Sequence, residues 1–352
     1  MTRAWSRALL AGLGLAWLLL ASPVVAAAGG ACRLAWGLAL EGQPVTAAQI
    51  AQGGRETGLA PRLVVFFLQW PAPGQTGEFP RASLEAIVQA GATPCLTWEP
   101  MHLDQQGQEV MARGEDILGG VYDAYLRAFA RAARTWGRPL IVRLGHEMNL
   151  ARYHWGGDQA EYGPDSPARY QRLYRHVVEV CRSEGAGNLL WAFCPNAESN
   201  PHPQWHGAAW NTATAYYPGD AYVDLLGMDG YNWGRSQTMA AQGWDSRWQE
   251  FAELFGGLRA ELRALAPDKP LLVFETSCSR AGGDRAAWAR GAARTARQWG
   301  LGGLVWFQAD KEVDWRLLAD RDAAAIAALA GALDCPPQAA PAWLQRPAKT
   351  RR

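Results

Sequence analysis

Eight short apolar runs, separated by stretches with helical periodicity, constrain the fold of this chain more than any other feature. The runs span residues 34–40, 63–70, 92–99, 140–147, 189–195, 223–231, 271–276 and 303–308. They are continuously apolar rather than alternating, which is typical of parallel strands covered on both faces. Strand alternating with helix eight times predicts an α/β fold, a single (β/α)8 (TIM) barrel.

The segments between the runs support this interpretation, because their apolar residues recur at helical spacing. Residues 122–136 and 248–265 show the pattern most clearly, each with one apolar face. Residues 167–181, 286–299 and 315–333 behave similarly. We therefore expect five helices over these ranges.

The two ends of the chain are kept apart from the fold prediction. Residues 1–28 read as an export signal, with Arg3 and Arg7 before an apolar stretch and small residues that fit cleavage after Ala26 or Ala28. The apolar stretch is shorter than the roughly 20 residues that span a bilayer. We expect a secreted or periplasmic protein with one domain over residues 32–335 and a disordered basic tail over residues 336–352.

Composition excludes some partners. The formal net charge is +1, which gives no electrostatic case for a nucleic-acid partner. No membrane partner is expected once the signal is removed, and the chain is expected to be a monomer. Eighteen tryptophans are the compositional outlier. Some of them must fill the core, and the rest fall in predicted loops where flat aromatic faces would suit sugar rings.

Cysteines in an exported chain permit disulfides. Cys32 precedes the first predicted strand and Cys335 follows the last predicted helix, so closure of the barrel would allow a Cys32–Cys335 disulfide. Cys32 could instead carry a lipid, although Gly29 stands where an aliphatic residue would be expected. Cys95 and Cys194 lie inside predicted strands and should be buried thiols, whereas Cys278 could be either.

Two glutamates carry the strongest chemical signal. Glu147 and Glu275 stand at the C-terminal ends of the fourth and seventh apolar runs. In a parallel barrel these ends converge on one face, where such proteins keep their chemistry. Two convergent carboxyl groups indicate glycoside hydrolysis, and a retaining reaction needs them about 5–5.5 Å apart. The alternative for either residue alone is a salt-bridged position on the rim.

Other chemistries find little support. His202 and His206 are four residues apart, but Pro201 and Pro203 make a helix there improbable, so no metal site is expected. There is no Gly-x-Ser-x-Gly elbow, and the Gly-Leu-Gly at residues 12–14 belongs to the export signal. No cofactor is expected. The long loops after the third to sixth strands instead indicate a substrate cleft on one rim.

Three ordered segments resemble glycoside hydrolase family 26, a retaining family of barrel glycosidases. Residues 143–149 (Arg-Leu-Gly-His-Glu-Met-Asn) resemble its acid/base segment, residues 217–234 its sixth strand, and residues 269–276 its nucleophile strand. The resemblance implies a retaining endo-β-glycosidase that most often cuts β-1,4-mannan, and the export signal makes it an exported one. Mixed-linkage β-1,3/1,4-glucan and β-1,3-xylan are the alternatives within the family, and a catalytically silent carbohydrate-binding barrel is the alternative outside it.

The same resemblance assigns roles by position. Glu147 is the acid/base and Glu275 is the nucleophile. By this resemblance His146 lines the sugar site beside the acid, Tyr231 has its hydroxyl on the nucleophile, and Trp306 lies under the reacting sugar. Tyr153, Trp155 and Trp233 are further candidates to line the sugar site, with core or loop packing as the alternative for the two tryptophans. Arg143 should point into the barrel and anchor a carboxylate in a bidentate pair, or else form a buried structural ion pair.

One departure from the family pattern concerns the sugar. Leu150, Ala151 and Arg152 stand where the family usually shows Gly, a variable residue and Trp. An arginine there suggests an anionic or acetylated glycan. Several residues stay open between site and packing roles: Trp191, Trp205, Trp210, Trp244, Asn196, Asp224 and Asp229.

Overall fold

The computed structural model describes residues 34–333. The expected export signal, the basic tail and the Cys32–Cys335 pair lie outside these residues. Within them, Cys95, Cys181, Cys194 and Cys278 are free and buried, as expected for Cys95 and Cys194. No helix in this part of the chain is long and apolar enough to cross a bilayer.

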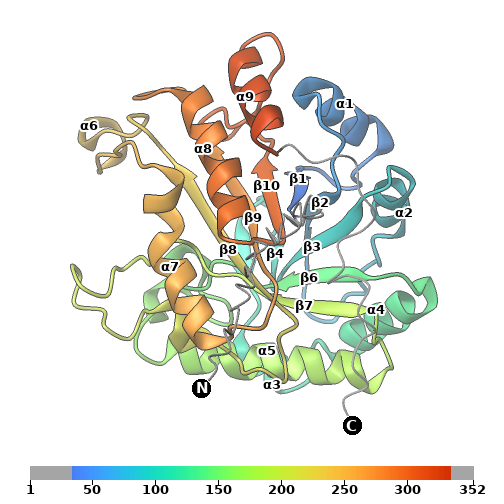
Figure 1. Ribbon diagram of the computed structural model, residues 1–352. Helices are drawn as coiled ribbons and strands as arrows, with labels where there is room; N and C mark the ends of the chain where they lie inside the picture. Colours follow the sequence, from blue (N-terminus) through green and yellow to red (C-terminus); the bar gives the residue numbers. More distant parts are fainter. Residues whose placement is uncertain (1–33, 334–352) are drawn as a thin grey trace, which may run out of the picture. The chain divides into compact units, whose positions relative to one another are not determined.

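All eight predicted strands form, and they close into one parallel barrel (Figure 1). The strands are β1 Ala35–Ala39, β2 Leu63–Gln69, β3 Thr93–Glu99, β6 Leu140–Leu144, β7 Leu189–Phe193, β8 Leu225–Asn232, β9 Leu271–Cys278 and β10 Gly303–Phe307. Neighbours around the barrel follow the order β1-β10-β9-β8-β7-β6-β3-β2, so β6 and β9 are the fourth and seventh strands. The predicted (β/α)8 fold is confirmed.

Helices surround the strands, as Figure 1 shows. They are α1 Ala47–Thr57, α2 Arg81–Gln89, α3 Gly114–Leu118, α4 Asp123–Trp136, α5 Ser166–Ser183, α6 Met239–Gln242, α7 Phe251–Leu265, α8 Arg285–Gln298 and α9 Ala323–Leu333. Four of the five expected helices match within a few residues.

The expected helix over residues 315–333 is wrong in its first part, because α9 begins only at Ala323. The carbonyl of Trp315 accepts hydrogen bonds from Trp306 Nε1, Ser277 Oγ and Arg285 Nη2, at 2.9, 2.8 and 2.8 Å. An oxygen used by three side-chain donors cannot also serve a helical ladder. The apolar residues before Ala323 therefore belong to a loop.

The strands bury two separate sets of side chains, because successive residues point to opposite faces of the sheet. Ile141, Phe274, Val305 and other inward residues form a cluster inside the barrel. Outward residues such as Val142 pack against the helices in a second, larger cluster. Arg143 is fully buried and lies two residues after Ile141 on β6. Alternation along the strand therefore places its side chain inside the barrel as well.

The long connections follow the C-terminal ends of β3, β6, β7 and β8, as expected. The β3 connection carries a hairpin of β4 Met101–Leu103 and β5 Glu109–Met111. The β6 and β7 connections carry the short 3-10 helices Ala151–Tyr153, Gln159–Glu161 and Ala213–Tyr216. These loops build the rim on which Glu147 and Glu275 lie.

Candidate active site

Glu147 is aimed by a sharp turn that follows β6. Gly145 has φ +53°, and a Cβ there would lie 3.1 Å from the ring of Trp155, so the position is limited to glycine. Glu147 itself has φ +51°, a left-handed conformation that is uncommon outside glycine. Its amide donates to the carbonyl of Cys194 at 2.8 Å, which ties the turn to the end of β7.

The carboxyl group of Glu147 is set up to hold a proton. The side chain is buried, and burial together with the nearby Glu275 raises its pKa to about 7. Asn196 Nδ2 donates to Glu147 Oε1 at 2.9 Å, a contact that opposes the rise. Glu147 is therefore partly protonated at neutral pH, which suits a general acid.

Glu275 reaches the barrel interior because of a β-bulge in β9. Met228 pairs with Val273, and the next residue, Asp229, pairs with Glu275, so β9 carries one extra residue at Phe274. The register with β10 shifts at the same place. Strict alternation from the inward Phe274 would turn Glu275 toward the helices. The bulge re-aims it, a common device beside active sites.

Two donors hold the Glu275 carboxylate. Arg143 Nη1 donates to Oε1 at 2.8 Å, and the Tyr231 hydroxyl donates to Oε2 at 2.5 Å. Arg143 also donates to Thr97 at 2.9 Å and to Asp229. The arginine thus bridges two carboxylates, Glu275 and Asp229. The expectation that it anchors a single carboxylate in a bidentate pair is wrong. The hydroxyl of Tyr231 contacts Glu275, the contact that the resemblance implied.

His146 is neutral and packed among aromatic rings. It is buried, and burial with the charge of Arg143 holds its pKa well below the usual value. Its ring centroid is 4.9 Å from that of Tyr153 and 6.2 Å from that of Phe67. Nδ1 has no hydrogen-bond partner among the described residues. Tyr153 is half-buried beside it, so both rings lie next to the acid.

Trp155 is placed by the structure behind the site rather than on its surface. The indole is buried, stacks on Tyr153 at 5.2 Å, and donates from Nε1 to the His146 carbonyl at 2.6 Å. The expectation that Trp155 touches substrate is wrong in this structure. It supports Tyr153 and His146 from below.

Trp306 is also outside the site, contrary to expectation. It is fully buried on the outer face of β10, with its ring 5.9 Å from that of Trp288 on α8. Alternation along β10 explains the error, since Val305 and Phe307 take the inward positions. Phe307 and Trp315 flank Tyr231 instead, at ring distances of 5.6 and 5.0 Å.

Trp233 extends this aromatic group toward the rim. Its ring contacts Trp315 at 4.9 Å and Trp244 at 5.6 Å. Trp233 is half-buried and Trp244 is exposed. Both therefore stay available to a ligand, whereas Trp191 is buried in the outer core and Asp224 accepts its backbone amide.

Glu99 is a site residue that the sequence reasoning missed. It ends β3, is almost fully buried, and its pKa is raised to about 8 by burial and by the charge of Glu275. The signal was present, because Glu99 ends an apolar run just as Glu147 and Glu275 do. A third carboxyl group thus lies at the same mouth.

Arg152 is already neutralised by a partner. Its two terminal nitrogens each donate at 3.0 Å to one oxygen of Glu109 on β5, and its guanidinium lies 4.9 Å from the centroid of the Tyr153 ring. This pairing weakens the expectation of an anionic glycan. No group of three or more metal-ligating side chains gathers within residues 34–333.

A closed parallel barrel with an acid at the end of its fourth strand and a fixed carboxylate on its seventh has the features of the glycoside hydrolase class. The model of glycosyl hydrolase family 26 matches residues 106–261. Over these residues the chain is similar to glycosyl hydrolase family 26, in agreement with the resemblance seen in the sequence.

Relatives agree with this assignment. Endoglucanase H of Acetivibrio thermocellus is 30% identical over 249 residues, which are 70% of this chain and 25% of that protein. A mannan endo-1,4-beta-mannosidase of Bacillus subtilis is 29% identical over 126 residues, 34% of this chain and 29% of the relative. The chain therefore spans only about a quarter of the length of these curated relatives.

Solved structures share the fold. The mannanase BCman of Bacillus subtilis superposes with a TM-score of 0.57 at 17% identity, covering 84% of this chain and 85% of that one. The GH26 beta-mannanase BoMan26A of Bacteroides ovatus gives 0.56 at 18% identity, covering 86% and 88%. At this identity the likeness supports the fold alone.

Proposed function

We propose that the protein is an exported, retaining endo-β-glycosidase whose substrate is a β-linked polysaccharide, β-1,4-mannan first. One observation carries the proposal: two carboxyl groups at one mouth lie in contrasting environments. Glu147 has a pKa of about 7, whereas Glu275 accepts hydrogen bonds from Arg143 and Tyr231. A protonated acid beside a fixed carboxylate is the pair that double displacement requires.

The reaction would run in two balanced steps. Glu275 attacks the anomeric carbon while Glu147 gives its proton to the departing glycosidic oxygen, and a covalent glycosyl ester forms. Glu147, now a carboxylate, then removes a proton from water, and the oxygen of that water displaces Glu275. The sugar is released with its original anomeric configuration, and Glu147 regains its proton.

Mannan is favoured by the names of several relatives, since similar proteins of Bacillus subtilis and Bifidobacterium adolescentis are mannan endo-1,4-beta-mannosidases. Mixed-linkage β-glucan is the second candidate, because the similarity covering most of this chain is to an endoglucanase. Arg152 also stands where the family usually shows a tryptophan, and this change concerns the identity of the sugar. β-1,3-Xylan is a third possibility within the family.

A catalytically silent binding barrel is disfavoured by the site itself. A barrel that only binds sugar gains nothing from a buried acid whose pKa lies near 7, because such a group costs stability whenever it ionises.

The proposal also includes export and a monomeric state. The mass of the mature chain recovered from periplasm or medium tests export, and its elution volume in size-exclusion chromatography tests the monomeric state.

Product analysis tests the reaction and its substrate together. Wild-type protein is incubated with β-1,4-mannan, mixed-linkage glucan and β-1,3-xylan side by side, and the first-formed anomer is read by proton NMR. We expect internal cleavage of one polymer with retention. Glu147→Gln and Glu275→Ala should each lose turnover by at least about 100-fold. Glu253→Gln, an exposed change on α7, is the matched control. Inverted product, or unchanged turnover in both variants, contradicts the proposal.

A further inference from the structure

A flat aromatic surface projects from the loop after β7. Trp205 is 76% exposed, which is unusual for the largest apolar side chain. Its indole stacks on the imidazole of His202, with ring centroids 3.9 Å apart and planes 14° apart. One face of the indole is therefore covered, and the residue is held as a platform rather than left loose.

A hydrogen-bonded turn fixes the ring beneath the platform. The amide of Gln204 donates to His202 Nδ1 at 3.1 Å, and the amide of His202 donates to His206 Nδ1 at 2.9 Å. The His206 amide closes the turn on the His202 carbonyl at 3.0 Å. Because Nδ1 of His202 accepts, the proton of the neutral ring is on Nε2. The platform is thus preorganised, which lowers the entropy cost of binding.

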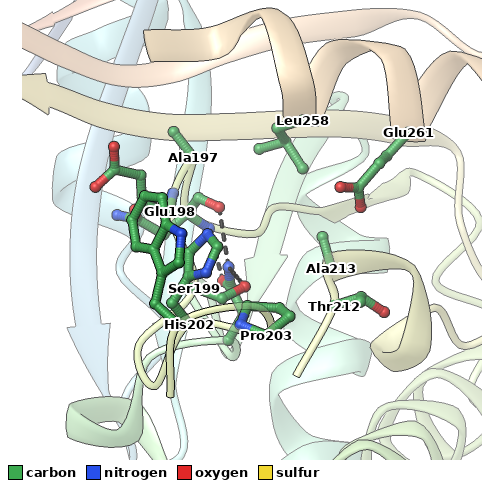
Figure 2. Close-up of a pocket in the computed structure, with 12 residues that line it drawn as sticks. Ala197, Glu198, Ser199, His202, Pro203, Thr212, Ala213, Leu258 and Glu261 are labelled. Carbon is green, nitrogen blue, oxygen red and sulfur yellow. Dashed lines mark hydrogen bonds between the residues drawn. The ribbon is translucent and has the colours of Figure 1, made fainter. Parts of the chain in front are cut away.

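The platform borders a pocket of about 120 Å³ between the β7 loop and α7 (Figure 2). His202 and Glu198 lie on one side of it, with Leu258 and Glu261 across from them. Glu198, Glu261 and Thr212 supply oxygen acceptors near an apolar face. Stacking faces combined with a few hydrogen-bonding groups are suited to the C–H face and hydroxyl groups of a pyranose.

The pocket is joined to the acid through two asparagines that also line it. Asn196 donates to Glu147 at 2.9 Å, and Asn149 donates to the carbonyl of Asn196 at 3.0 Å. The acid protonates the oxygen of the departing sugar, so the departing part of the chain lies on the side of Glu147. The pocket and its platform are on that side, next to Asn196.

We propose that Trp205 stacked on His202 is a binding site for the departing part of a β-linked polysaccharide, beyond the sugar that receives the proton. This inference rests on the proposed function. The site would add affinity for long chains and leave short substrates unaffected, because a short leaving group would end near Asn196, before it reaches Trp205.

Steady-state kinetics on two kinds of substrate tests the site. Trp205→Ala should raise KM for the polymer that wild type cleaves by about tenfold, the equivalent of about 1.4 kcal/mol of lost stacking. An aryl β-glycoside of the same sugar should be cleaved at the wild-type kcat/KM. Trp205→Phe should recover part of the loss. Retardation of each variant in gels containing the polymer gives binding without turnover.

Met239→Ala, which removes another exposed apolar side chain (61% exposed), is the matched control and should match wild type on both substrates. A Trp205→Ala protein with wild-type KM and wild-type retardation on the polymer overturns this inference and leaves the proposed function intact. A wild-type protein that neither cleaves nor binds any of the β-glycans overturns both.

Discussion

At the scale of single residues, the environment of Glu147 sets the working pH. Its pKa of about 7 predicts that kcat/KM falls as the pH rises through 7, because the acid loses its proton. The hydrogen bond from Asn196 favours the charged form and so lowers this pKa. Asn196→Ala should therefore move the alkaline limb of the kcat/KM profile to higher pH.

Asn188→Ala is the control for that shift, because Asn188 donates to carbonyls of Ala133 and Arg138, far from the acid in the hydrogen-bond network. Its alkaline limb should coincide with that of wild type. A limb that stays in place in Asn196→Ala, or moves to lower pH, would show that another group controls protonation.

Arg143 is the second residue with a sharp prediction. It is fully buried and bridges Asp229 and Glu275. Arg143→Met leaves two buried carboxylates without their cation and should cost about 3–5 kcal/mol in the free energy of unfolding. Arg143→Lys keeps the charge but cannot hold both carboxylates in fixed positions. It should fold and still lose most of kcat.

Denaturant unfolding and initial rates separate these two effects of Arg143. Arg81→Lys, in an exposed pair with Glu85, should leave both quantities unchanged. Wild-type kcat in Arg143→Lys would mean that the arginine stabilises the barrel without positioning Glu275.

Sequence reasoning placed Glu147, Glu275, His146 and Tyr231 at one mouth of the barrel, where the structure has them, because motif spacing puts them at strand ends; their roles stay predictions. It failed for Trp306, where the period of two along a strand decides which face a side chain occupies. The alternation of Val305, Trp306 and Phe307 could have corrected that assignment. Glu99 was missed although it satisfies the same strand-end rule as the two catalytic candidates.

At the scale of elements, all eight strands followed from their apolar runs, because burial on both faces leaves a continuous signal. The bulge in β9 did not follow, since nothing in the residues 271–276 marks an extra residue at Phe274. The late start of α9 did not follow either. The helix begins late because the Trp315 carbonyl accepts hydrogen bonds from the side chains of Trp306, Ser277 and Arg285. These donors come from three separate segments of the chain.

The hairpin β4–β5 supplies a prediction about substrate charge. Glu109 on β5 pairs with Arg152, which neutralises the arginine beside Tyr153. Glu109→Gln should free the guanidinium and lower KM for a carboxymethylated β-glycan by severalfold relative to the neutral polymer. The gain should vanish in high salt, because exposed charges are screened.

Stability should change little in Glu109→Gln, by less than about 1 kcal/mol, since the pair is partly exposed. Glu115→Gln, which removes an exposed partner of Arg113, is the control for a change in net charge. Equal KM ratios in Glu109→Gln and wild type would show that Arg152 does not face the bound glycan.

At the scale of the whole molecule, the buried carboxyl groups make stability depend on pH. Glu99 has an ordinary pKa of 4.5 when unfolded and about 8 when folded, so the folded protein retains a proton that the unfolded chain releases between these values. Stability is therefore highest below pH 4.5 with respect to this group and is lost as the pH rises toward 8. The loss is on the order of 5 kcal/mol, because each unit of pKa difference corresponds to about 1.4 kcal/mol.

Glu99→Gln removes this titration and should flatten the fall in unfolding free energy between pH 5 and 8, measured by denaturant unfolding. Glu253→Gln, at an exposed position, should keep the wild-type slope. A Glu99→Gln slope equal to that of wild type would place the proton elsewhere, on Glu147 for example.

The left-handed backbone at Glu147 has a consequence for how this protein can evolve. Glycine adopts φ +51° without penalty, whereas any side chain with a Cβ is strained there by about 1 kcal/mol. Glu147→Gly should consequently unfold at higher denaturant than Glu147→Ala, the reverse of the usual order, although neither turns over substrate. Stability and catalysis therefore favour different residues at position 147. A mutation to glycine that stabilises the fold would abolish turnover.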